Sequence, residues 1–249
     1  MTYDFLSSQI HRKLSNFSRT LLNKCLAMQR FIMAGQCSLC GGEAQDSGLC
    51  EACRESLPRL HGPLCAQCAH PLSTGTVCGR CLANPPSYDR VQAACRYDYP
   101  IAALIQDFKF GGRLQHARTL SALLNAGPRI CADLVIPMPL SPARLRARGF
   151  NQALALAIPL ARATGSAIDA TLCIRHRETV PQSQLPWQAR QGNIRGAFTV
   201  TRNLPSLRVM VVDDVLTTGA TLNELARVLK KAGAAEVVGC VVARTVSRH

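Results

Sequence analysis

The chain has 249 residues, and 29 lysines and arginines stand against 15 aspartates and glutamates, for a net charge of +14. With 47% apolar residues, the composition excludes a globally disordered chain, and no run approaches the roughly 20 apolar residues of a membrane-spanning helix. The positive charge predicts affinity for anions such as phosphates and nucleic acid, although an arginine-rich surface can also serve solubility alone.

Residues 1–36 are predicted to form a basic helical extension. Apolar residues recur at helical spacing from Ile10 to Leu21, and five basic residues accompany a single acid, Asp4. Such a helix either contacts a membrane or nucleic acid or packs on its own protein. The segment lacks the apolar stretch of a secretory signal, so we expect a cytoplasmic protein with reduced cysteines.

Residues 37–82 are predicted to form a double zinc ribbon. Eight of the 13 cysteines form four CxxC pairs, and a shift of 28 positions superimposes the first two pairs on the last two. Four thiolates at this spacing suit a structural zinc ion, and a unit this small needs the metal to fold. We assign one ion to the first four cysteines and one to the last four: Cys37, Cys40, Cys50 and Cys53, then Cys65, Cys68, Cys78 and Cys81.

Other interpretations of these cysteines stay open at this point. An interleaved pairing of the four CxxC units is compatible with the spacing, as are disulfides, a redox CxxC or an iron–sulfur cluster. The remaining cysteines have no partner at ligand spacing and are expected to be ordinary buried thiols. They are Cys25, Cys95, Cys131, Cys173 and Cys240.

After a linker at residues 82–90, the pattern predicts an α/β domain over residues 91–249. Strands are expected at 91–99, 134–137, 171–174, 208–212 and 237–242, and helices at 100–110, 114–126, 151–164 and 222–231. Strands that alternate with helices favour a parallel sheet flanked by helices, and continuous apolar strands such as 208–212 are typical of its centre.

The most informative segment is residues 209–221, VMVVDDVLTTGAT. An apolar strand leads to Asp213 and Asp214, a turn rich in threonine and glycine follows, and a helix begins at once. Backbone N–H groups of such a turn and of a helix N-terminus bind phosphate, and Gly219 allows close approach of the backbone. The alternative interpretation is that these aspartates and threonines only cap the following helix and bind no phosphate.

This segment resembles the phosphoribosyl pyrophosphate (PRPP) signature of the type I phosphoribosyltransferases. The resemblance implies that the turn, Thr217, Thr218, Gly219, Ala220 and Thr221, binds the 5′-phosphate of PRPP. It also implies that Asp213 and Asp214 bind the ribose hydroxyls, with Mg²⁺ accompanying PRPP. Together with the cysteine-rich region and the run Arg148-Gly-Phe-Asn-Gln152, the chain resembles the ComF family of competence proteins and its GntX-like relatives.

Cations suited to the pyrophosphate of PRPP lie upstream of the signature. Arginines cluster at 144–148, where related transferases carry their pyrophosphate loop, and arginine binds phosphate oxygens in a bidentate manner. Residues 137–195 hold eight arginines and two acids, although a charged run is usually a solvated face. Residues 175–190 are predicted to form a loop that closes over the ligand. The candidate pyrophosphate ligands are Lys109, Arg144, Arg148 and Arg190.

Three functions fit the sequence. The ComF resemblance implies a PRPP-binding protein that handles single-stranded DNA during natural transformation, with competence proteins as partners. A second possibility is an active phosphoribosyltransferase with an unknown acceptor, since the acid pair and Mg²⁺ could stabilise charge at the reacting carbon. The third is an adaptor that acts through its zinc ribbons. Aromatic residues make up only 5% of the chain, which disfavours binding of single strands by base stacking.

Overall fold

The computed structural model describes residues 35–44, 48–176 and 194–246. The chain divides into two compact units, Met1–Arg54 and Glu55–His249. The first unit contains the first four CxxC cysteines, and the second contains the other four together with the sheet. The basic helical extension was predicted over residues 1–36, of which residues 1–34 lie outside the described residues.

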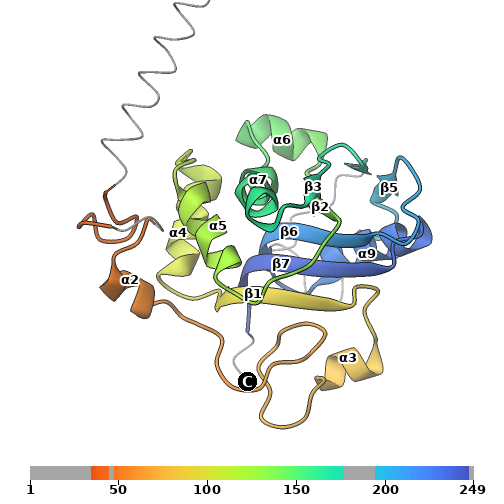
Figure 1. Ribbon diagram of the computed structural model, residues 1–249, viewed down its shortest axis with the longest axis horizontal. Coiled ribbons are helices and arrows are strands. Elements are labelled where there is room, and N and C mark those ends of the chain that lie inside the picture. The colour runs from red at the N-terminus through yellow and green to blue at the C-terminus, as the bar shows by residue number, and fades with distance from the viewer. Residues whose placement is uncertain (1–34, 45–47, 177–193, 247–249) are drawn as a thin grey trace, which may run out of the picture. The chain divides into compact units, whose positions relative to one another are not determined.

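The described residues form the helices and strands drawn in Figure 1, in which all of them except β4 are labelled. The helices are α2 (Glu51–Glu55), α3 (Gly79–Ala83), α4 (Ile101–Phe110), α5 (His116–Asn125), α6 (Pro142–Arg148), α7 (Gln152–Thr164) and α9 (Ala220–Lys231). The strands are β1 (Arg90–Arg96), β2 (Leu134–Pro137), β3 (Ala167–Ile168), β4 (Cys173–Arg175), β5 (Phe198–Val200), β6 (Arg208–Leu216) and β7 (Glu236–Arg244).

A five-stranded parallel sheet with the order β1-β7-β6-β2-β3 forms the centre of the second unit (Figure 1), which confirms the predicted fold class. β6 and β7 lie in the middle and are buried on both faces, as their continuous apolar sequences predict. Strands β4 and β5 pair antiparallel in a separate small sheet. Because the five strands are parallel, their carboxyl ends meet at one edge, where open α/β sheets bind ligands.

Helices cover both faces of this sheet. Cys240 and Met210 border the same cavity as Leu124 of α5 and Leu160 of α7, so that face carries α5 and α7. The neighbouring residue on β7, Gly239, points to the opposite face, where a Cβ atom would lie 2.5 Å from Leu222 of α9. Gly239 therefore allows α9 to pack closely on the central strand.

Three features differ from the sequence predictions. Strand β6 does not end at Val212 but continues through both aspartates to Leu216, because β7 pairs with it along this whole length. Residues 142–148 form a helix, α6, which the sequence analysis did not predict although Ser141 caps it and Gly149 ends it in the left-handed conformation. Strands β3 and β5 are too short to show a periodic pattern.

Candidate functional site

A cavity of about 740 Å³ lies at the carboxyl edge of the sheet. Its walls bring together residues that are distant in the sequence: Lys109, Arg144, Arg148, Asp213, Asp214 and Thr217. The structure thus places two predicted acids, three predicted cations and part of the predicted phosphate turn around one space. The fourth predicted cation, Arg190, and most of the predicted closing loop 175–190 lie outside the described residues.

The two carboxylates of the acid pair have different surroundings. Asp214 is buried, and its Oδ2 lies 2.8 Å from Nζ of Lys109, so it forms a largely buried ion pair. Asp213 is partly buried, and its Oδ1 accepts a hydrogen bond of 2.9 Å from the backbone N–H of Asp214. Burial and the neighbouring Asp214 charge raise the pKa of Asp213 to about 7, against the opposing effect of Lys109. The carboxylate that is best placed to meet a ligand is therefore Asp213.

The turn between β6 and α9 has the geometry of an anion site. Gly219 adopts a left-handed conformation at φ +83°, and a Cβ at this position would lie 3.1 Å from the hydroxyl of Tyr88. The hydroxyl of Thr218 accepts a hydrogen bond from the N–H of Ala220. The first turn of α9 contains no acid, so nothing negative in it opposes an anion at the positive end of this 12-residue helix.

The run Arg148–Gln152 connects the arginines of α6 to the frame of the domain. Gly149 ends α6, and Phe150 packs against Phe108 at a ring distance of 5.6 Å. Asn151 caps α7 through the N–H groups of Ala153 and Leu154, and its amide donates to the carbonyl of Met138. Arg148 in turn donates to the side chain of Gln152. The whole run therefore fixes where Arg148 enters the cavity.

The three arginines of α6 do not share one environment. Arg144 and Arg148 are one helical turn apart and both line the cavity, and the Arg148 guanidinium lies 5.2 Å from the ring centroid of Phe110. Arg146 is exposed and is not one of the residues that line the cavity. The arginine cluster thus supplies two cations to the cavity and one to the surface.

Arg175, at the end of β4, is a site residue that the sequence analysis missed. It lines the same cavity, it is only 5% exposed, and its guanidinium lies 5.6 Å from the ring centroid of Phe198. Burial and the nearby Arg144 lower its pKa to about 10, and Asp213 acts in the opposite direction. The sequence placed Arg175 at the start of a polar loop, and only the pairing of β4 with the distant β5 reveals its position.

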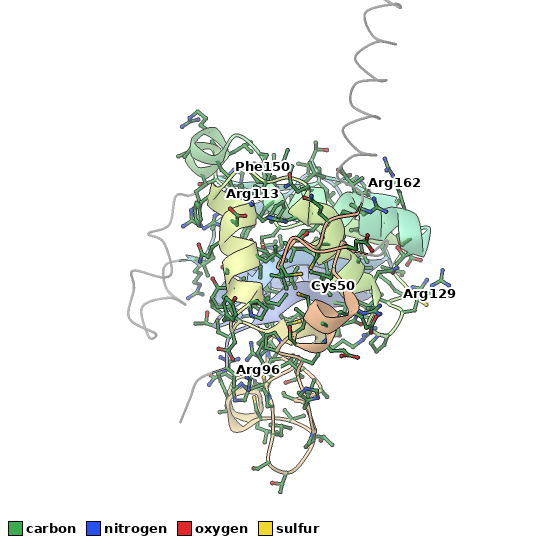
Figure 2. The ribbon with its side chains drawn as sticks, turned by 90° about the vertical axis from the view of Figure 1, so that its left-hand side faces the viewer. Cys50, Arg96, Arg113, Arg129, Phe150 and Arg162 are labelled. Atoms are coloured by element: carbon green, nitrogen blue, oxygen red, sulfur yellow. The ribbon has the colours of Figure 1, made fainter. Side chains whose placement is uncertain are left out.

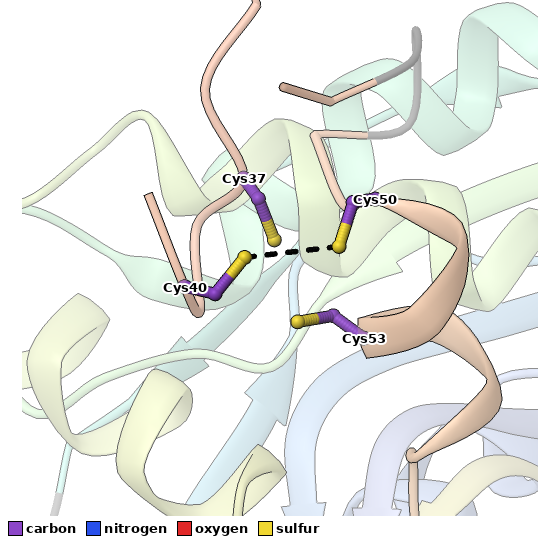
Figure 3. A group of neighbouring side chains, drawn as sticks. All are labelled: Cys37, Cys40, Cys50 and Cys53. Carbon is purple, nitrogen blue, oxygen red and sulfur yellow. Dashed lines mark hydrogen bonds between the residues drawn. The ribbon is translucent and has the colours of Figure 1, made fainter. Parts of the chain in front are cut away.

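The eight CxxC cysteines gather in the sequential pairing that the sequence analysis assigned. Within each group, the four sulfur atoms lie within 4.8 Å of one another. Figure 3 shows the first group, in which the sulfurs of Cys40 and Cys50 are 3.7 Å apart; those of Cys68 and Cys78 are separated by the same distance. Sulfurs on a tetrahedral zinc ion with bonds of about 2.3 Å would be ~3.8 Å apart, so both groups fit structural zinc.

The two cysteine groups differ in burial. In the first tetrad (Cys37, Cys40, Cys50 and Cys53) only Cys37 is buried, whereas in the second tetrad (Cys65, Cys68, Cys78 and Cys81) all but Cys78 are buried. Burial of Cys65 opposes ionisation, but hydrogen bonds from backbone N–H groups outweigh it and lower the pKa of this thiol to about 6. In the same tetrad, burial raises the pKa of the Cys68 and Cys81 thiols.

The other cysteines include one correction. Cys95, Cys173 and Cys240 are buried, as predicted, and burial raises the pKa of each thiol. Cys131 is exposed, so the prediction that it is buried is wrong; it lies in the irregular segment before β2. Cys25 lies outside the described residues.

We expect about two zinc ions per chain, because each tetrad offers four sulfurs at zinc-binding separation. Cys40→Ser should lower the zinc content to about one ion per chain and leave the second unit folded, since the first tetrad belongs to the other compact unit. The matched control is Cys131→Ser, a change of an exposed cysteine outside both tetrads, which should keep both ions. Elemental analysis of protein purified without chelators measures this, and a zinc content near zero would contradict it.

The comparisons with known proteins cover both parts of the chain. Residues 28–82 match the family model described as a double zinc ribbon domain, and residues 153–248 match the phosphoribosyl transferase domain. Among the described residues, none of the helices is long and apolar enough to cross a bilayer.

Three relatives illustrate the similarity. The DNA utilization protein YhgH of Salmonella typhimurium is 34% identical over 209 residues, which cover 80% of this chain and 91% of the relative. Competence protein F of Haemophilus influenzae is 34% identical over 216 residues, covering 81% and 93%. Competence protein ComFC of Bacillus subtilis is 26% identical over 205 residues, covering 78% and 82%.

Proposed function

We propose, from the premise that this chain belongs to the ComF family, that it binds PRPP with Mg²⁺ and handles single-stranded DNA during DNA uptake in natural transformation. The observation that carries the first half is the cavity at the carboxyl edge of the sheet, which joins an anion-binding turn, an acid pair and several cations. The second half rests on the net charge of +14 and on the names of the relatives, which refer to competence and DNA utilization.

Each part of the cavity suits one part of PRPP. The turn Thr217–Thr221 and the N-terminus of α9 would bind the 5′-phosphate, and Asp213 would accept hydrogen bonds from the ribose hydroxyls. Arg144 and Arg148 would bind the pyrophosphate. Mg²⁺ prefers oxygen ligands, which Asp213 and the phosphates offer, and it would neutralise part of the pyrophosphate charge.

The DNA half of the proposal involves a distributed surface. Exposed arginines occur on strands, helices and connecting segments of the second unit, as Arg96, Arg113, Arg129 and Arg162 illustrate in Figure 2. Such a surface binds the phosphates of a strand without reading its sequence. Competence proteins are the partner class that fits this role.

Isothermal titration calorimetry with PRPP and Mg²⁺ tests the first half of the proposal, and fluorescence anisotropy with a labelled single strand tests the second on the same preparation. We expect saturable PRPP binding that weakens when Mg²⁺ is omitted, because the metal offsets the pyrophosphate charge. Wild-type protein without a binding signal at millimolar PRPP would refute the first half. A single strand that fails to bind at low salt would refute the second.

Transfer of phosphoribose to an acceptor is the second candidate function. It is favoured by Asp213 and Asp214, two carboxylates beside the predicted ribose position, because negative charge there stabilises positive charge that develops at the sugar carbon. Pyrophosphate release in the presence of PRPP and a panel of nucleobases, amines or single-stranded DNA would distinguish a transferase from a protein that only binds PRPP.

A further inference from the structure

Arg244, the last residue of β7, lies between the second tetrad and the phosphate turn. Its Nη2 donates to Sγ of Cys68 at 3.6 Å, and its Nη1 donates to the backbone carbonyl of Thr217 at 3.4 Å. The residue is only 2% exposed and is the largest of the fully buried side chains. One guanidinium therefore contacts both a candidate zinc ligand and the turn that would bind the 5′-phosphate.

A cation this deeply buried requires a counter-charge. Within the part of the chain that the structure describes, no carboxylate forms an ion pair with Arg244. A zinc ion bound by four thiolates carries a net charge of −2, from one Zn²⁺ and four negative sulfurs. With zinc bound, the second tetrad would therefore supply negative charge to Arg244, which contacts it through Cys68.

Packing connects the same two places. Cys65, Cys68 and Cys81 share a buried cluster with Leu216, which precedes the turn, and with Ala220, which belongs to it. Tyr88, in the segment that leads from the ribbon to β1, belongs to this cluster too, and its hydroxyl occupies the space beside Gly219. A displacement of the second tetrad would therefore change both a hydrogen bond to the turn and the packing beneath it.

We propose that the second tetrad, when it holds zinc, fixes the conformation of the phosphate turn through Arg244. Arg244 is a positioning residue in this scheme, because it reaches the turn through the carbonyl of Thr217 and lies beneath it. The proposal rests on the proposed PRPP site. It adds that tight phosphate binding requires metal at the second tetrad but not at the first.

The primary test needs no ligand. Amide hydrogen exchange of residues 216–222 should accelerate about 10-fold in Arg244→Met, as expected for the loss of a charge-assisted hydrogen bond, while zinc content stays at two ions per chain. Arg244→Lys keeps the positive charge but lacks the second nitrogen with which the guanidinium reaches both Cys68 and Thr217. This variant should therefore recover part of the protection from exchange. If residues 216–222 exchange in Arg244→Met at the same rate as in the wild type, the proposal is overturned.

Removal of one metal at a time provides the matched comparison. Cys68→Ser and Cys40→Ser should each lose one zinc ion, but only Cys68→Ser should accelerate exchange at residues 216–222 and weaken PRPP binding, again about 10-fold. Equal effects of the two substitutions, on either measurement, would overturn the proposal.

A spectroscopic test remains informative if the Arg244 or Cys68 variants do not fold. Cys40→Ser protein loaded with cobalt(II) carries its metal only at the second tetrad, so its thiolate-to-cobalt absorption bands report on that site. Binding of PRPP should shift these bands, and unchanged bands at saturating PRPP would overturn the coupling. If wild-type protein binds no PRPP at all, the proposed function fails, whereas the ligand-free exchange experiment still decides the role of Arg244.

Discussion

Asp213→Asn should weaken Mg²⁺-dependent PRPP binding by about 100-fold and leave the protein folded. The loss corresponds to the charge-assisted hydrogen bonds from the ribose hydroxyls and to the attraction between the carboxylate and Mg²⁺, which a neutral amide cannot replace. Asp213 is the partly buried member of the acid pair, and its Oδ1 accepts a hydrogen bond from the backbone N–H of Asp214, which an amide oxygen can also accept. Titration calorimetry at fixed Mg²⁺ measures the effect.

The same substitution should stabilise the ligand-free protein at alkaline pH. The folded-state pKa of Asp213, about 7, lies above its ordinary value, so the charged form is disfavoured in the fold and stability falls as pH rises through this interval. Removal of the charge should raise the free energy of unfolding by about 1 kcal/mol at pH 8, or roughly 2–4 °C in Tm. At pH 4, where wild-type Asp213 is protonated, the difference in unfolding free energy between the variant and the wild type should vanish. A Tm for Asp213→Asn below that of wild type at pH 8, without added Mg²⁺, would contradict the assignment.

Asp214→Asn is the matched control, because it changes the neighbouring carboxylate but breaks the 2.8 Å ion pair with Lys109. Because the substitution leaves the largely buried Lys109 without its counter-charge, it should lower the free energy of unfolding by about 1–2 kcal/mol. The two variants should therefore shift Tm in opposite directions. If both lower Tm equally, the acid pair serves the fold, and the assignment of Asp213 to ligand binding is wrong.

The sequence predicted those parts of the site that are encoded by contiguous residues. The apolar strand, the turn and the helix of residues 208–231 occur in one run, so both the phosphate turn and its place at the sheet edge could be inferred. The zinc tetrads were predictable for the same reason, because one CxxC turn already directs two sulfurs to one point.

The sequence could not predict contacts that depend on which strands and helices become neighbours. Lys109 was predicted as a pyrophosphate ligand, but only the packing of α4 near the end of β6 shows that it pairs with Asp214. Arg244 lies beyond the strand predicted at residues 237–242, and its contacts with Thr217 and Cys68 span 27 and 176 residues. Such long separations leave no periodic or local signal in a single sequence.

Salt should weaken single-stranded DNA binding steeply. Each phosphate neutralised on a single strand contributes about −0.7 to the slope of log affinity against log salt, so four to six contacts predict a slope near −3 to −4. Between 50 and 200 mM salt, affinity should then fall roughly 50- to 300-fold. Anisotropy titrations at several salt concentrations measure the slope, and an affinity that does not change over this range would rule out binding through the backbone phosphates.

The geometry of α6 allows the DNA contacts to be separated from the PRPP contacts. Arg144 and Arg148 line the cavity, whereas Arg146 is exposed outside it, so charge reversal at these positions should have different consequences. Arg144→Glu with Arg148→Glu should weaken PRPP binding at least about 10-fold and reduce the magnitude of the DNA salt slope by about 1.4, if each arginine meets one phosphate. Arg146→Glu should reduce the magnitude of the DNA salt slope by about 0.7 and leave PRPP binding unchanged.

Competition provides the remaining discrimination between a shared and a separate DNA surface. If the strand passes over α6 into the cavity, PRPP should displace DNA from wild-type protein and from Arg146→Glu, because Arg144 and Arg148 would serve both ligands. The Phe110 ring next to Arg148 makes a thermal melt a necessary control for the double variant, since the reversed charge removes that cation–π contact. A folded double variant with a wild-type salt slope would remove α6 from the DNA surface and direct attention to the exposed arginines on the other elements of the second unit.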